Sequence, residues 1–130
     1  MVIILNIATR ARTDFIDITQ KVNEAVKDSK MTEGVCYVFI PHTTASVTIN
    51  ENADPDVFFD IKKELEKIVP FDDKYQHTEG NSAAHIKASI IGSSESVLVE
   101  NGKLLLGTWQ GIFLCEFDGP RQRKVFVKII

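Results

Sequence analysis

The residues best suited to chemistry are the chain's three histidines, which occur in only two stretches. His77 and His85 lie within Tyr75–Ser89, which also contains Glu79, and His42 lies upstream. Imidazole titrates near neutral pH and is a common ligand of transition metals. We therefore expect the two stretches to meet in space and form one site.

Three histidines would match a catalytic zinc site that keeps a fourth position open for water or substrate. The spacing of His42, His77 and His85 matches no tight motif, so three separate, partly exposed imidazoles are the alternative. Glu79 lies two residues after His77, and on an extended segment both side chains would share a face. We expect Glu79, with His77 beside it, to act as a general base, and a solvated loop glutamate is the alternative.

A second set of residues is suited to binding the substrate. Asn81 and Ser82 stand at a predicted helix start, where free amides favour an anion such as phosphate. Trp109 lies between two glycines, where a ligand can approach closely, but the indole could instead fill the core. The guanidinium of Arg121 could hold a phosphate or carboxylate from the rim. The candidate substrate-binding residues are Thr43, Thr44, Asn81, Ser82, Trp109, Gln110 and Arg121.

Length and composition predict one globular domain spanning residues 1–130. A net charge of -3, with no basic patch, argues against a nucleic-acid partner. No apolar run approaches the roughly 18 residues that a membrane span requires. The apolar start Met1–Leu5 lacks the flanks of a signal peptide. Cys36 and Cys115 lie in apolar runs, as buried free thiols do, and we expect a soluble, cytoplasmic protein.

Hydrophobic periodicity predicts an α+β fold with a largely antiparallel sheet, two or three helices and a C-terminal β-meander. The first strand should lie at a sheet edge, and Val35–Ile40 should be buried on both faces. Helices are predicted after Thr19 as N-cap to about Lys30, at Pro55–Pro70 with Asp54 as N-cap, and at Ser82 to about Ile91. Strands are predicted at Val2–Ala11, Asp14–Ile18, Val35–Ile40, Ser46–Asn50, Ser96–Glu100, Lys103–Leu106, Thr108–Phe117 and Arg123–Ile130.

Six ordered motifs carry a resemblance to a known family. They are Pro41–Ala45, Asn50–Pro55, His77–Asn81, Ala84–His85, Gly107–Gln110 and Glu116–Arg121. Together they resemble the YjbQ-like family, whose members are described as secondary thiamine-phosphate synthases. The resemblance implies a small α+β domain that assembles as a homotrimer, with the histidine motifs in a metal-binding pocket near subunit contacts. Before Ile40 the chain resembles the family mainly in its pattern.

The implied reaction joins a pyrimidine methyl diphosphate to a thiazole phosphate and releases pyrophosphate. Such chemistry needs a cation to neutralise the leaving group and donors for its oxygens. Magnesium, the usual partner of pyrophosphate, prefers oxygen ligands, whereas three histidines favour zinc. Two alternatives to a synthase stay open: a zinc-dependent hydrolase, and a trimeric module that binds a metal or phosphorylated metabolite without turnover.

Overall fold

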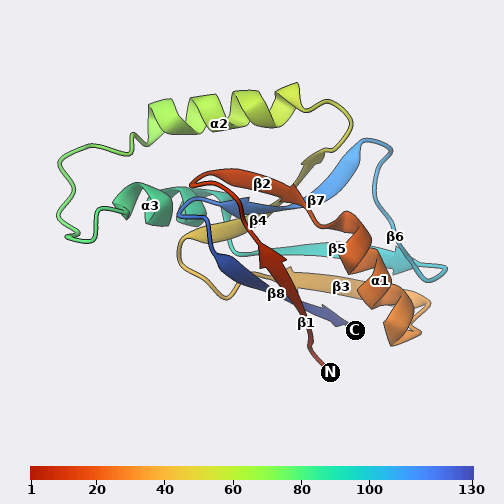
Figure 1. Cartoon of the computed structure of the whole chain (residues 1–130). Coiled ribbons are helices and arrows are strands. Elements are labelled where there is room, and N and C mark those ends of the chain that lie inside the picture. The colour runs from red at the N-terminus through yellow and green to blue at the C-terminus, as the bar shows by residue number, and fades with distance from the viewer.

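Eight strands in two antiparallel sheets and three helices make up the fold, which confirms the α+β class (Figure 1). The structure is a computed structural model and describes residues 1–130. The helices are α1 (Thr19–Ser29), α2 (Asp56–Ile68) and α3 (Ser82–Ile91). The strands are β1 (Ile3–Ala8), β2 (Asp14–Asp17), β3 (Glu33–Phe39), β4 (Ala45–Glu51), β5 (Ser94–Glu100), β6 (Lys103–Leu104), β7 (Gln110–Glu116) and β8 (Gln122–Ile129).

The two sheets differ in size and in the order of their strands. The five-stranded sheet has the order β1-β8-β3-β5-β6, and the three-stranded sheet has the order β2-β7-β4. The expected edge position of β1 is therefore confirmed. The last third of the chain is not one continuous meander, because β7 lies in the three-stranded sheet and β8 inserts between β1 and β3. Only β5 and β6 pair as a hairpin, at Asn101 and Gly102, whose φ angles are 52° and 73°.

Strand β7 is buried on both faces and separates two hydrophobic cores. Ile112 and Leu114 belong to the larger core, between the two sheets, which also contains one side of α1. Cys115 and Phe117 belong to the smaller core, where Leu65 of α2 and residues of α3 pack against them. The molecule therefore has three layers: the five-stranded sheet, the three-stranded sheet, and α2 with α3 (Figure 1).

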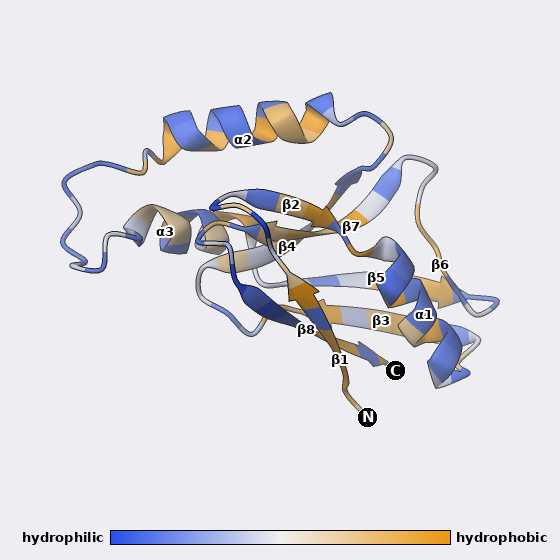
Figure 2. Ribbon diagram, viewed as in Figure 1, coloured by the Kyte–Doolittle hydropathy of each residue, from blue (hydrophilic) through white to orange (hydrophobic).

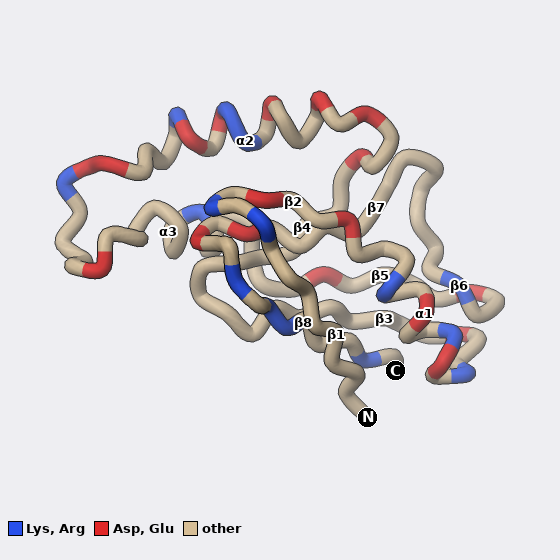
Figure 3. Tube along the Cα trace, viewed as in Figure 1, with Lys and Arg blue, Asp and Glu red and all other residues tan.

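The helices follow the predicted pattern closely. Helix α3 begins and ends at the predicted residues, and α1 ends one residue early. Helix α2 spans Asp56–Ile68, so it is shorter at both ends than predicted, and its N-cap is Pro55 rather than the predicted Asp54. The Asp54 carboxylate accepts the Asp56 N–H at 2.9 Å. Polar residues line the outer side of α2 in Figure 2, and Figure 3 shows both acidic and basic residues along it.

Strand β3 corrects one prediction, because it is buried on one face only. Cys36 and Val38 are fully buried, whereas Tyr37 and Phe39 are 47% and 45% exposed. The five-stranded sheet has a second layer on one side only, so alternate side chains of β3 face outward. The run of apolar residues in this strand therefore does not indicate burial on two faces.

Both cysteines are free and buried, as predicted. Burial raises the pKa of the Cys36 thiol to about 11 and that of Cys115 to about 12, so neither thiol ionises near neutral pH. None of the three helices is long and apolar enough to cross a bilayer.

Candidate functional site

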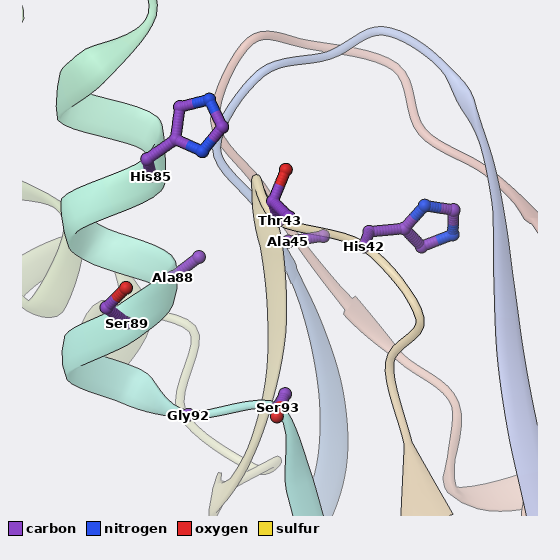
Figure 4. A pocket seen from close by; sticks show the side chains of 8 residues that line it. All are labelled: His42, Thr43, Ala45, His85, Ala88, Ser89, Gly92 and Ser93. Atoms are coloured by element: carbon purple, nitrogen blue, oxygen red, sulfur yellow. The ribbon is translucent and has the colours of Figure 1, made fainter.

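A polar cavity of about 470 Å³ lies between the loop that follows β3 and one side of α3 (Figure 4). Imidazole and hydroxyl groups dominate its lining, and no carboxylate contributes to it. The lining residues are His42, Thr43, Ala45, His85, Ala88, Ser89, Gly92 and Ser93. The structure thus brings His42 and His85 to one cavity, although 43 positions separate them in the chain.

His42 is held by the backbone of β8 rather than by another histidine. Its Nε2 atom accepts the N–H of Lys124 at 2.9 Å, which places the proton of the neutral ring on Nδ1. Burial, followed by the nearby Arg123 charge, lowers the pKa of His42 below 6.5. Figure 4 shows its ring turned away from the ring of His85. At neutral pH His42 is therefore an uncharged imidazole.

His77 and His85 lie next to each other, and Glu79 lies beside His77. The ring centroids of the two histidines are 5.4 Å apart, with the rings nearly perpendicular. The Nε2 atom of His77 lies 3.8 Å from Glu79 Oε2, and both side chains are exposed. The two catalytic candidates are therefore close enough to exchange a proton through small side-chain movements or one water.

The three histidines do not converge within one chain. No three His, Cys, Asp or Glu side chains lie close enough together to hold a metal ion. His77 and His85 fit as a pair of nitrogen donors for zinc, whereas His42 already accepts a backbone N–H and faces elsewhere. A three-histidine centre would require His42 to rotate or to come from another copy of the chain.

The start of α3 provides free hydrogen-bond donors beside His85. No side chain caps this end of the helix, and the N–H groups of Ser82 and Ala83 donate to no other group of the chain. Ser82 also lines a shallow hollow of about 390 Å³ that is shared with His77 and His85. His85 therefore stands between two hollows, and the free amides lie next to it.

On the opposite side of the start of α3, the Asp118 carboxylate accepts hydrogen bonds from two of the predicted binding residues. Asn81 Nδ2 donates to Asp118 Oδ2 at 2.9 Å, and Arg121 Nη2 donates to the same oxygen at 2.7 Å. The Oδ1 atom of Asn81 is buried without a partner. Asn81 and Arg121 are thus brought together near the site, but the Asp118 carboxylate partly neutralises the guanidinium that was predicted to bind an anion.

A buried ion pair next to the cavity was missed in the sequence. Glu116 and Arg123 are 0% and 4% exposed, and their side chains form two hydrogen bonds. Arg123 also donates to the Thr44 hydroxyl at 2.7 Å, and Thr9 donates to Glu116 at 2.8 Å. Thr44 is therefore occupied inside the protein, and only Thr43 faces the cavity. The sequence does contain one indication of this pair: Arg123, Val125 and Val127 alternate with other residues, which places Arg123 on the buried face of β8.

Trp109 and Gln110 lie far from the cavity within one chain. They pair with the far end of β4, where Gln110 lies opposite Glu51, whereas the cavity residue Ala45 begins that strand. Seven residues of β4 separate its ends by roughly 20 Å. Trp109 is 63% exposed, so the alternative that it fills the core is wrong.

The fold and the cavity define a small α+β domain with a polar site at one end of its three-stranded sheet. The model of the UPF0047 protein YjbQ-like family matches residues 3–130, and the chain therefore belongs to this family. A UPF0047 protein of Methanocaldococcus jannaschii is 50% identical over 124 residues, which cover 95% of this chain and 90% of the relative. The YugU protein of Bacillus subtilis is 48% identical over 127 residues, covering 97% and 96%.

Solved structures of related proteins have the same fold. The crystal structure of an uncharacterized YjbQ/UPF0047 protein from Clostridium acetobutylicum matches with a TM-score of 0.97 at 58% identity, over 98% of this chain and 99% of that one. A protein from Sulfolobus solfataricus matches with a TM-score of 0.95 at 32% identity, covering 99% and 95%. The latter is described as a protein of unknown function, so family membership gives the fold rather than a reaction.

Proposed function

We propose that this protein is a cytoplasmic enzyme that acts on a phosphorylated small molecule at the cavity beside His85. The proposal rests on the groups around His85, which are imidazoles, hydroxyls and free backbone amides. No carboxylate lines either of the two hollows beside this residue. Such a set donates hydrogen bonds to phosphate oxygens and does not repel their charge. The two free thiols agree with a reducing compartment.

In this proposal, the substrate's phosphate lies against the amide of Ser82 and the hydroxyl of Thr43, which line the two hollows beside His85. His77 and Glu79 lie on the rim, where Glu79 would act as the general base toward an attacking water. In the synthase reaction the thiazole nitrogen attacks with its lone pair and gives up no proton. The reaction that fits best is thiamine-phosphate synthase-like: a pyrimidine methyl diphosphate loses pyrophosphate, and a thiazole phosphate takes its place. The donors around His85 would stabilise the oxygens of the leaving pyrophosphate.

We also propose that the site binds a divalent metal, with zinc favoured over magnesium. His77 and His85 would each supply one nitrogen, and His42 would supply the third. The ion would contribute Lewis acidity toward phosphate oxygens. Because His42 faces away from the other two rings, this form of the site depends on a second copy of the chain or on rotation of His42.

We also propose that the protein is a homotrimer whose site lies near the subunit contacts. Support comes from the outer face of the five-stranded sheet, where four large apolar residues are exposed on one side: Ile4, Tyr37, Phe39 and Leu98. Exposed apolar surface of this kind favours an interface. A neighbouring copy could also bring Trp109 and Gln110 to the cavity, which one chain does not.

The main alternative is a module that binds the same phosphorylated ligand without converting it. The exposure of His77 and Glu79 favours this alternative, because an exposed acid–base pair is not desolvated for catalysis. A zinc-dependent hydrolase would use the same residues with water in place of the thiazole phosphate.

The Glu79→Gln variant separates these possibilities. Pyrimidine methyl diphosphate and thiazole phosphate are supplied with zinc or magnesium, and the product is quantified by mass spectrometry. If Glu79 is the base, hydrolysis of the pyrimidine methyl diphosphate falls about 10²–10⁴-fold while metal content, measured by elemental analysis, stays unchanged. Glu64→Gln, an equally exposed change on α2, is the matched control and retains full turnover.

In the same experiment, metal content is measured for three further variants: His42→Ala, His77→Ala and His85→Ala. Loss of one metal per chain in all three variants supports the three-histidine centre, and loss in the last two alone leaves only the His77–His85 pair. Unchanged turnover in Glu79→Gln removes Glu79 from the mechanism. Phosphate-dependent stabilisation of the wild type without any product would favour the binding module.

A further inference from the structure

Lys87 is a buried residue whose ammonium has no hydrogen-bond or ion-pair partner, and burial lowers its pKa while the more distant Glu66 carboxylate raises it. It is 5% exposed, makes no side-chain hydrogen bond, and has no carboxylate within 4.0 Å. It lies two residues after His85 on α3, which turns it about 200° away around the helix axis. Lys87 is therefore not part of the cavity beside His85.

A separate cavity of about 310 Å³ borders Lys87. Arg12, from the connection between β1 and β2, lies at the same cavity, and its guanidinium stacks on the Phe71 ring at 3.9 Å. Figure 3 shows basic residues side by side on this connection and on α3. Pro70 and Phe117 add apolar walls. Two cations from different elements thus share one partly apolar cavity.

The charges around this cavity leave one positive charge uncompensated. Arg12 and Lys87 are cationic, and Glu66 is the only acidic residue of the lining. No ion pair within 4.0 Å joins Glu66 to either cation. A buried charge without a partner is costly, and proteins keep such groups mainly where a ligand or partner supplies the opposite charge.

We propose that this cavity binds a small organic carboxylate with an apolar body. A single negative charge balances the net charge of the lining, and the planar guanidinium of Arg12 can hold both carboxylate oxygens. Lys87 supplies the second, buried contact, while Phe71, Pro70 and Phe117 receive the apolar part. This site is independent of the phosphate site proposed above, because the two lie on opposite sides of α3.

The test uses benzoate as the probe, with inorganic phosphate and benzylamine beside it, followed by NMR of the ¹⁵N-labelled protein. We expect benzoate to shift the amides of Ala84 and Lys87, which line this cavity, in a saturable way, with a Kd on the order of 1 mM for a ligand of this size. The variant Lys87→Met should raise this Kd at least about tenfold, since a charged hydrogen bond is lost. Lys63→Met, which removes an exposed lysine from α2, should leave the Kd unchanged.

A stability measurement and a second variant test the proposal further. The urea midpoint of Lys87→Met should equal or exceed that of the wild type, because the substitution removes an unpaired buried charge. If Lys87→Met does not fold, Arg12→Gln serves instead, because Arg12 is exposed and its loss should also weaken benzoate binding. The proposal is overturned if benzoate causes no saturable shift, if binding is unchanged in both variants, or if phosphate or benzylamine binds there in its place. Loss of turnover in Glu79→Gln with benzoate binding intact would show that the two sites are separate.

Discussion

At the scale of single residues, two ion pairs in neighbouring positions differ only in their surroundings. Glu116–Arg123 lies inside the protein, where it joins the end of the three-stranded sheet to β8. Asp118–Arg121 lies at the surface, with the Arg121 side chain half exposed. A charge that loses its partner inside the protein cannot turn to water, whereas an exposed charge can.

We therefore expect Arg123→Gln to lower the free energy of unfolding by about 3–5 kcal/mol, because it leaves the Glu116 carboxylate buried and unpaired. Arg121→Gln should cost no more than about 1 kcal/mol, since its pair is screened by solvent. Urea denaturation monitored by circular dichroism measures both. Equal losses in the two variants would show that the buried pair contributes no more than the exposed one.

A double variant sharpens this comparison. Replacing Glu116 with Gln and Arg123 with Met removes both charges, so no unpaired charge remains. The double variant should then recover part of the stability that Arg123→Gln loses. Further loss in the double variant would mean that the hydrogen bonds to Thr9 and Thr44, rather than the charge balance, hold this end of the core together.

At the scale of elements, α2 is attached to the protein mainly through its apolar side. Phe58 is 8% exposed and stacks on Phe113 of β7 with ring centroids 4.2 Å apart, whereas the next residue, Phe59, is 68% exposed. Phe58→Ala should therefore cost about 3–5 kcal/mol of unfolding free energy. Phe59→Ala changes it by about 0.5 kcal/mol or less. Calorimetry measures both variants, and a large loss in Phe59→Ala would indicate that another chain covers this face of α2.

The helices were predictable because their signals are local. Gly92 ends α3 at the predicted residue, and Phe58 and Leu65 already mark the buried side of α2 by their spacing. The pairing of β7 and β8 with different sheets was not predictable, because it depends on contacts between distant segments. For the same reason the outward-facing Tyr37 and Phe39 were read as buried.

Of the predicted site residues, His42, Thr43 and His85 line the cavity, whereas Thr44, Trp109 and Gln110 do not. His85 and Ser89 are four residues apart on α3, so they share a face of the helix and line one cavity. Two facts had no signal in the sequence. Lys124 donates its backbone N–H to His42, and Arg123 engages Thr44, so both residues of the Pro41–Ala45 stretch are partly occupied within the chain. Both contacts come from β8, which enters beside this loop from the far end of the chain.

At the scale of the whole molecule, the proposed homotrimer places the outer face of the five-stranded sheet at the subunit contacts. If this face forms the trimer contact, Phe39→Lys should yield a folded monomer, because a lysine in the centre of an apolar interface leaves its charge desolvated. Light scattering should give three times 14.6 kDa for the wild type and 14.6 kDa for the variant. Phe59→Lys on α2 adds the same charge elsewhere and should remain a trimer. A monomeric wild type at micromolar concentration would refute this assembly.

The pairing of β1 with β8 also has a consequence for how the chain acquires its structure. Ile3 lies opposite Val127, so the first strand finds its only neighbour in the last one (Figure 1). During synthesis β1 therefore has no partner until β8 has also been made. Contacts between such distant residues also slow folding, because the loop must close before they form. The five-stranded sheet is therefore completed late, after the helices and hairpin, whose contacts are local.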